Sequence, residues 1–131
     1  MSIISITLNG STGKMGTAFA HALLNEKAQE LEIKYQTRSS TKLADLITYC
    51  TASDILVDFS TPESIYNIIN ATKTTGIKLL VGTTGLSTEQ LNDLKSVSKT
   101  NSVLYAPNAS IGANLLAEIA TKVAKANKES D

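Results

Sequence analysis

Residues 3–16 read IISITLNGSTGKMG, a short apolar run followed by a turn with three glycines. The apolar run predicts a buried strand. After the turn, apolar residues recur at helical spacing and predict an amphipathic helix: Met15, Ala18, Phe19, Ala22 and Leu23. A glycine-rich turn that leaves a strand and opens a helix is the context in which proteins bind the pyrophosphate of a dinucleotide.

Each glycine of this G-x-x-G-x-x-G turn has a predicted role. Gly10 makes the tight turn, Gly13 lets a pyrophosphate approach the backbone, and Gly16 lets helix and strand pack closely. A P-loop is excluded, because it requires glycine at position 8 and serine or threonine at position 15, where the sequence has Leu8 and Met15. A glycine turn that joins strand to helix without a ligand stays open as an alternative.

Apolar runs alternate with amphipathic segments through the rest of the chain. We predict strands at 3–8, 31–36, 55–59, 78–81 and 103–105, and helical segments at 15–23, 43–47, 65–72, 87–97 and 115–123. Thr61 is a candidate cap ahead of Pro62 at the first helical position, and Ser87 with Gln90 is a capping-box signature. This order predicts an α/β fold over residues 1–131: a Rossmann-like, doubly wound, mainly parallel sheet with helices on both faces.

The composition narrows the classes of partner. Twelve basic and twelve acidic residues cancel, so no global field favours nucleic acid or an anionic membrane. Cys50 is the only cysteine, and no segment resembles a signal peptide or a membrane span, so we expect a cytoplasmic protein. We expect no bound metal, and the sequence leaves homo-oligomerisation open.

The end of the second predicted strand should select the cofactor. Residues 35–40 read YQTRSS and contain no acidic residue to bind the ribose hydroxyls. Arg38, with hydroxyl groups beside it, favours a 2′-phosphate and therefore NADPH over NADH. A solvated loop arginine is the equal alternative.

Three further polar segments follow predicted strands, where parallel sheets bind their ligands. They are DFSTPE at 58–63, GTTG at 82–85 and APNASIG at 106–112. Asn108 could reach a carboxamide such as that of nicotinamide. Ordinary helix-entry turns also favour such residues, but three of them beside a glycine turn favour a binding site.

These four segments together resemble the dihydrodipicolinate reductase family, whose pattern is G-x-x-G-x-M-G, D-F-[ST]-x-P-E, G-T-T-G and A-[AP]-N-F-S-x-G-x-N. The resemblance covers residues 3–123, and Ala109 stands where the pattern has phenylalanine. It implies a pyrophosphate cradle at Gly10, Ser11, Thr12, Gly13, Lys14 and Met15. It implies adenosine contacts from Gln36, Thr37 or Arg38, and an adenine border at Asp58 and Phe59. It also implies a nicotinamide pocket lined by Gly82, Thr83 and Thr84, with Ala106, Pro107, Asn108 and Ala109 on its far side.

The family's H-H-x-x-K-x-D-A-P-S-G-T stretch, which carries its proton donor and substrate groups, has no counterpart here. The only histidine, His21, lies within the first predicted helix and is not expected to be catalytic. We therefore expect an NAD(P)H-binding domain without the family's C-terminal substrate and catalytic domain, and no catalytic residue in this chain.

Three hypotheses are consistent with these features. In the first, the full-length enzyme transfers hydride from NAD(P)H to a cyclic dicarboxylate in lysine and diaminopimelate biosynthesis, and this chain alone is inactive. In the second, the chain is a stand-alone nucleotide-binding module that regulates a partner or senses redox state. A different Rossmann oxidoreductase is the third, and the ordered set of motifs argues against it.

Overall fold

The computed structural model describes residues 3–25, 30–107, 118–123 and 125. In this part of the chain, five strands form one sheet in the order β2-β1-β3-β4-β5. The strands are β1 (Ile4–Asn9), β2 (Leu31–Thr37), β3 (Ile55–Asp58), β4 (Lys78–Val81) and β5 (Val103–Tyr105). Every neighbouring pair is parallel. The predicted α/β fold with a parallel sheet is therefore confirmed.

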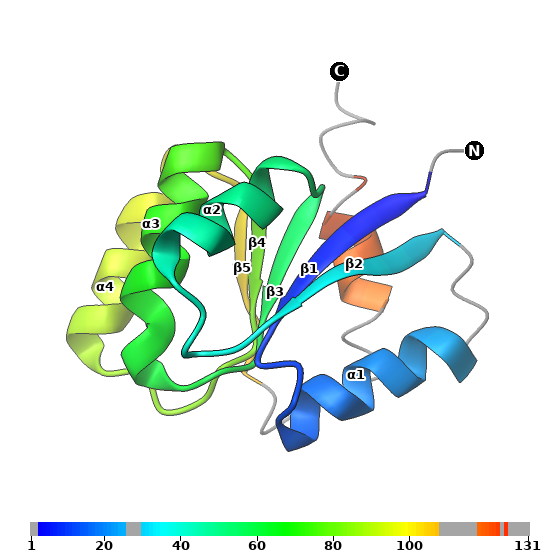
Figure 1. The fold of residues 1–131 in the computed structure, drawn as a ribbon. Helices are drawn as coiled ribbons and strands as arrows, with labels where there is room; N and C mark the ends of the chain where they lie inside the picture. The colour runs from blue at the N-terminus through cyan, green and yellow to red at the C-terminus, as the bar shows by residue number, and fades with distance from the viewer. Residues whose placement is uncertain (1–2, 26–29, 108–117, 124, 126–131) are drawn as a thin grey trace.

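Helices cover both faces of the sheet (Figure 1). The helices are α1 (Lys14–Asn25), α2 (Leu43–Thr51), the 3-10 turn η1 (Pro62–Ser64), α3 (Ile65–Thr75) and α4 (Thr88–Val97). Helix α1 lies on one face, together with a helical segment at 118–123, and α2, α3 and α4 lie on the other. None of the described helices has the length and apolarity needed to cross a bilayer.

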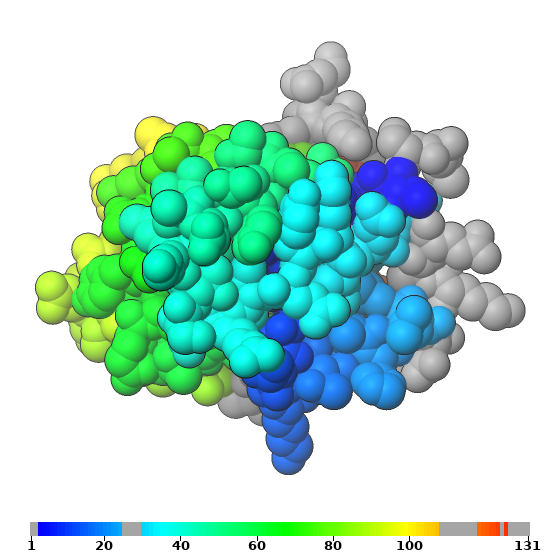
Figure 2. Space-filling view, viewed as in Figure 1, coloured from blue at the N-terminus to red at the C-terminus, as the bar shows by residue number. Residues whose placement is uncertain are grey.

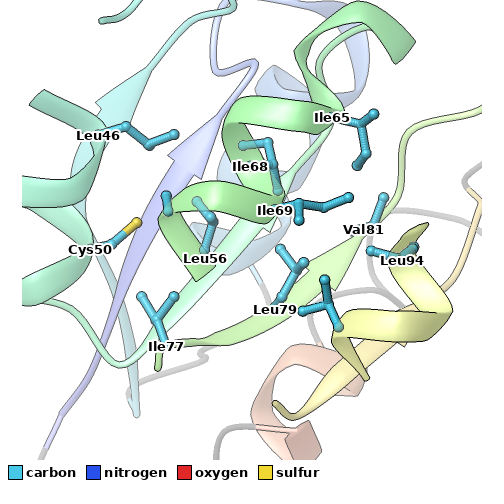
Figure 3. Close-up of a cluster of buried hydrophobic side chains, with 12 residues drawn as sticks. Leu46, Cys50, Leu56, Ile65, Ile68, Ile69, Ile77, Leu79, Val81 and Leu94 are labelled. Carbon is cyan, nitrogen blue, oxygen red and sulfur yellow. The ribbon is translucent and has the colours of Figure 1, made fainter. Parts of the chain in front are cut away.

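The apolar residues of the central strands alternate between the two faces. Ile55 and Val57 of β3 join a core on the α1 side, whereas Leu56 between them faces α3. The α1-side core contains Ile4, Ile6, Leu8, Phe19, Leu23, Leu31, Ile55, Val57, Phe59, Leu80 and Ala120. The α3-side core contains Leu46, Cys50, Leu56, Ile65, Ile68, Ile69, Ala71, Ile77, Leu79, Val81, Leu94 and Val97 (Figure 3). Strands buried on both faces explain the nearly continuous apolar runs in the sequence.

Predicted and observed boundaries agree closely. β4 and β5 have the predicted ends, β1, β2 and β3 differ by about one residue, and α2 continues beyond the predicted segment to Thr51. The capping box at α4 is confirmed: the Ser87 hydroxyl accepts from the Gln90 amide at 3.1 Å, and the Gln90 side chain accepts from the Ser87 amide at 2.8 Å. Leu115 and Leu116 of the last predicted helix lie outside the described residues.

The predicted side-chain cap at Thr61 is wrong. Its hydroxyl makes no capping hydrogen bond, although Pro62 does occupy the first helical position. The segment begins as a tight 3-10 turn, in which the Ser64 amide donates to the backbone carbonyl of Thr61 at 3.0 Å. The backbone thereby satisfies the amide that the hydroxyl was expected to satisfy.

Ile68 of α3 has no exposed surface and lies in the α3-side core. We expect Ile68→Ala to lower the free energy of unfolding by about 2–5 kcal/mol, because the change removes buried methyl groups and leaves a cavity. Tyr66→Ala on the same helix is the control, since Tyr66 is 46% exposed and should cost less than about 1 kcal/mol. Urea denaturation measures both, and equal losses would contradict this assignment of the core.

Candidate functional site

The turns that follow β1, β2, β3 and β4 lie together at one edge of the sheet, here named the carboxyl edge (lower side of Figure 1). Because the strands are parallel, their carboxyl ends all meet there. The chain runs outward from β1 to β2 on one side and from β3 to β5 on the other, so the strand order reverses between β1 and β3. Open parallel sheets bind ligands at this reversal.

Two glycines of the first turn are required by the fold itself. Gly10 has a φ of 83°, and a Cβ there would lie 2.6 Å from the backbone carbon of Phe59. A Cβ on Gly16 would lie 2.1 Å from the carbonyl oxygen of Gly10. Gly16 therefore allows close packing, as predicted, and the contact is between the first turn of α1 and Gly10.

Gly13 differs from the other two. A Cβ on Gly13 would meet only the Gly10 carbonyl oxygen, at an ordinary contact distance of 3.5 Å, and the residue is exposed. The fold therefore does not require glycine at this position. Thr12 and Lys14 beside it are exposed too, and the start of α1 (blue) protrudes from the molecule in Figure 2. The first amides of a helix have no partners within the helix, so this surface offers donors to an anion.

The glycine turn is fastened to the end of β2. The carbonyl of Thr37 accepts from the amides of Gly10 at 2.9 Å and Ser11 at 3.3 Å. The Ser11 hydroxyl donates to the same carbonyl at 3.4 Å. Thr37 thus joins the predicted pyrophosphate turn to the segment that begins with Arg38.

A buried hydrogen-bond network connects the strand ends beneath these turns. Asn9, the last residue of β1, accepts from the Thr37 hydroxyl at 2.7 Å and donates to the Asp58 carboxylate at 2.9 Å. Asp58, the last residue of β3, also accepts from the hydroxyls of Thr83 at 2.9 Å and Ser60 at 2.6 Å. Asn9, Thr37, Asp58 and Thr83 are all buried. The network therefore spans the strand reversal between β1 and β3.

Burial also governs the charge of Asp58. The loss of water around the carboxyl raises its pKa above the ordinary value of 3.8, and hydrogen bonds from Ser60, Asn9 and Thr83 oppose that rise. Desolvation is the largest of these causes. The protein consequently holds an ionisable group at the centre of the carboxyl edge, hydrogen-bonded to donors from Asn9, Ser60 and Thr83.

An aromatic ring fills the space between the turns. Phe59 is buried, and its ring lies 5.3 Å from that of Phe19, measured between centroids. A Cβ on Gly82 would lie 2.2 Å from Cε1 of this ring. The missing side chain at Gly82 therefore makes room for Phe59, so packing alone accounts for glycine there.

The structure separates the predicted binding residues into two groups by exposure. Thr37, Asp58, Phe59, Gly82 and Thr83 are buried, and the side chains of the four residues other than Gly82 face the interior of the protein. Exposed or partly exposed at the carboxyl edge are Gly10, Ser11, Thr12, Gly13, Lys14, Met15, Gln36, Arg38, Thr84, Ala106 and Pro107. Asn108 and Ala109 lie outside the described residues.

Asn9 is the buried residue of this network that the sequence prediction missed. Its signal was present: a carboxamide that ends an otherwise apolar strand, directly before the first glycine of the turn. A polar side chain in that position is buried at the sheet edge and needs partners, which the ends of the neighbouring strands supply. His21 is exposed on α1.

Arg38 begins a short polar loop between β2 and α2. Its amide donates to the Thr41 hydroxyl at 3.0 Å, and its carbonyl accepts from the Thr41 amide at 2.9 Å. The side chains of Arg38, Ser39 and Ser40 are exposed. A guanidinium and two hydroxyls are therefore available to an anion directly after the residue that holds the glycine turn.

We expect the stability of the protein to decrease as pH rises from about 4, through the contribution of Asp58. Its raised pKa means that the folded state binds this proton more tightly than the unfolded state does. The stabilisation is complete below the unfolded pKa, and it is lost as pH rises through the folded pKa. Urea denaturation across a pH series measures the slope, and Asp58→Asn should flatten it. Glu63→Gln is the control, because the pKa of exposed Glu63 is lowered and its contribution has the opposite sign. An unchanged slope in Asp58→Asn would contradict the assignment.

Comparison with known proteins identifies the related sequences. The family described as "Dihydrodipicolinate reductase, N-terminus" matches residues 4–109. The 4-hydroxy-tetrahydrodipicolinate reductase of Rickettsia rickettsii (strain Sheila Smith) is 40% identical over 123 residues, which cover 94% of this chain and 51% of that protein. The reductase of the same name from Helicobacter hepaticus is 32% identical over 137 residues, covering 98% of this chain and 54% of that protein. The chain spans about half the length of these curated relatives.

Solved structures agree on the fold. Dipicolinate-bound dihydrodipicolinate reductase from Paenisporosarcina sp. TG-14 superposes with a TM-score of 0.65 at 23% identity, covering 93% of this chain and 54% of that one. A signal receiver domain of a diguanylate cyclase from Desulfovibrio desulfuricans G20 gives 0.66 at 9% identity, covering 99% of this chain and 100% of that one. Identities this low establish the architecture alone. The match over residues 4–109, together with the strand ends and glycine turn described above, shows that this chain belongs to the dihydrodipicolinate reductase family and corresponds to its N-terminal part.

Proposed function

We propose that residues 1–131 form the NAD(P)H-binding domain of a 4-hydroxy-tetrahydrodipicolinate reductase, with the dinucleotide lying along the carboxyl edge. The observation that carries the proposal is the exposed Gly13 at the start of α1, where the fold leaves room for a side chain that the sequence does not supply. A phosphate needs such open backbone, with unpaired helix amides beside it. Membership of the family supports the same ligand.

The residues at this edge fit a dinucleotide in three parts. The turn from Gly10 to Met15 would hold the pyrophosphate through backbone amides and the charge of Lys14. Arg38, with Gln36 beside it, would hold the adenosine end. Thr84 and the backbone around Thr83, together with Ala106 and Pro107, would face the nicotinamide. When bound, NAD(P)H would supply the hydride. The residues of this chain would bind the dinucleotide, orient it and limit the access of water to it.

The full-length enzyme would reduce a cyclic dicarboxylate in lysine and diaminopimelate biosynthesis. Residues that bind this substrate and donate the proton would lie in a further domain, since the sequence contains no H-H-x-x-K-x-D-A-P-S-G-T stretch. The 131-residue chain should therefore bind the cofactor without reducing the substrate. We also propose that the protein is cytoplasmic.

NADPH is the favoured cofactor. Residues 35–40 lack a carboxylate, which would otherwise bind the ribose hydroxyls of NADH and repel a 2′-phosphate. The exposed Arg38 guanidinium matches a phosphate in charge and in hydrogen-bonding geometry. Thr37 contributes less than the sequence predicted, because its hydroxyl donates to Asn9 inside the protein.

We expect the wild-type chain to bind NADPH, and Gly13→Ala to weaken binding by about tenfold or more, which corresponds to about 1.4 kcal/mol. The added methyl group projects into the open space and changes the free energy of unfolding by less than about 1 kcal/mol. Calorimetric titration and urea denaturation measure the two quantities.

Gly16→Ala is the matched control for that experiment. Its methyl group would collide with the Gly10 carbonyl and lower stability by about 1–3 kcal/mol. A wild-type chain that does not bind NADPH, or Gly13→Ala with unchanged affinity, would contradict the proposed site. Reduction of the dicarboxylate by the wild-type chain would contradict the proposed division between domains.

We expect Arg38→Gln to weaken NADPH binding by about tenfold to a hundredfold, because the change removes charge-assisted hydrogen bonds to the 2′-phosphate. Affinity for NADH, which lacks that phosphate, should change by less than about twofold. Lys99→Gln removes the same charge after α4, away from the carboxyl edge, and should leave both affinities unchanged. Parallel losses for NADPH and NADH would show that Arg38 does not select the cofactor.

A further inference from the structure

Asn9 lies at the strand reversal, and its side chain reaches the end of β2 on one side and the end of β3 on the other. It lies at the end of β1, with β2 paired on one side and β3 on the other. Its carboxamide oxygen accepts from Thr37 at the end of β2, and its nitrogen donates to Asp58 at the end of β3. Only 2% of the residue is exposed, so water does not supply these partners.

The chemistry of the network fixes the direction of each of these hydrogen bonds. When ionised, the carboxylate of Asp58 can only accept, so Asn9, Ser60 and Thr83 must all donate to it. Asn9 therefore presents its NH2 group to Asp58, which leaves its oxygen to accept from Thr37. A primary carboxamide places a donor and an acceptor on one planar, uncharged group, so it satisfies both neighbours at once. An aspartate would face Asp58 with a second acceptor, and a leucine of the same shape would offer neither.

Thr37 links the buried Asn9 side chain to the glycine turn at the surface. Its hydroxyl donates to Asn9, while its carbonyl accepts from the amides of Gly10 and Ser11. The next residue is Arg38. The side chain of Asn9 thus adds to the backbone hydrogen bonds that hold the end of β2 against the glycine turn, where the Arg38 loop begins.

We propose that Asn9 is a positioning residue, which never touches the cofactor but holds the pyrophosphate turn and the adenosine segment at the separation that one dinucleotide spans. The inference rests on the proposed function. A ligand that bridges both segments gains affinity from their fixed spacing, because no binding energy is used to order them. A ligand that contacts only one segment gains nothing from that spacing.

The two kinds of ligand therefore distinguish positioning from general stability. NADPH bridges both segments, whereas adenosine 2′-monophosphate has the 2′-phosphate but no pyrophosphate. We expect Asn9→Leu to weaken NADPH binding by about tenfold and adenosine 2′-monophosphate binding by less than about twofold. Thr37→Val, which removes only the hydroxyl that donates to Asn9, should show the same pattern and serves as the test if Asn9→Leu does not fold.

Thr7→Val is the matched control. Thr7 lies on the same strand, is fully buried, and shares a 2.7 Å hydrogen bond with the Ser53 hydroxyl, away from the carboxyl edge. Loss of this hydrogen bond in Thr7→Val should lower stability without changing the affinity for either ligand. Hydrogen exchange gives a readout that needs no ligand: the Gly10 and Ser11 amides should exchange faster in Asn9→Leu but not in Thr7→Val.

Each outcome of the titrations is decisive. Weaker binding of NADPH alone in Asn9→Leu or Thr37→Val, with normal binding in Thr7→Val, supports the proposal. Unchanged NADPH affinity, equal loss for both ligands, or the same loss in Thr7→Val overturns it and leaves the nucleotide site intact. Absence of NADPH binding by the wild-type chain overturns the proposed function and the role of Asn9 together.

Discussion

The buried carboxylate of Asp58 is the group on which the arrangement of the carboxyl edge depends. It has no exposed surface, and an ionised group without water is stable only when hydrogen-bond donors surround it. Those donors come from β1, from the turn after β3 and from the turn after β4: Asn9, Ser60 and Thr83. None of these segments can move alone without leaving a charge or a donor unpaired. The parallel sheet brings the strand ends together, and this carboxylate then fixes the turns relative to one another.

A network that holds turns in place cannot also use the same atoms to hold a ligand. Thr37 and Thr83 direct their hydroxyl protons inward, to Asn9 and Asp58, and both residues are buried. The groups left for a ligand are those that the interior does not use: the amides at the start of α1, and the side chains of Lys14, Arg38 and Thr84. The buried residues of the edge thus hold the turns in place, and the exposed residues above them would contact a ligand. Preorganised amides on a rigid support are what an anion-binding turn requires.

The sequence predicted the sheet well because its physics is local and periodic. Strands such as β4 are apolar on both faces and stand between turn residues, and the capping box at Ser87 is a contact between residues three apart. The inward or outward direction of Thr37 and Asp58 was not predictable, because it depends on Asn9, which lies 28 residues from one and 49 from the other. The cap at Thr61 was wrong for a related reason: spacing identified a competent hydroxyl, but the 3-10 turn had already satisfied the amide through the backbone.

The glycines at the carboxyl edge are of two kinds: some are required by the packing of the fold, and one is not. Gly10, Gly16 and Gly82 all stand where a Cβ would overlap atoms of this chain, so a protein with this fold would need them whether or not it bound a nucleotide. Gly13 stands where a Cβ would fit, so nothing in the described structure explains why this residue lacks a side chain. The spacing of glycines in the sequence gives these positions equal weight, whereas the structure distinguishes them. The evidence for a ligand is therefore concentrated at the single glycine that the fold does not need, and the other three explain how the turn that presents it is held.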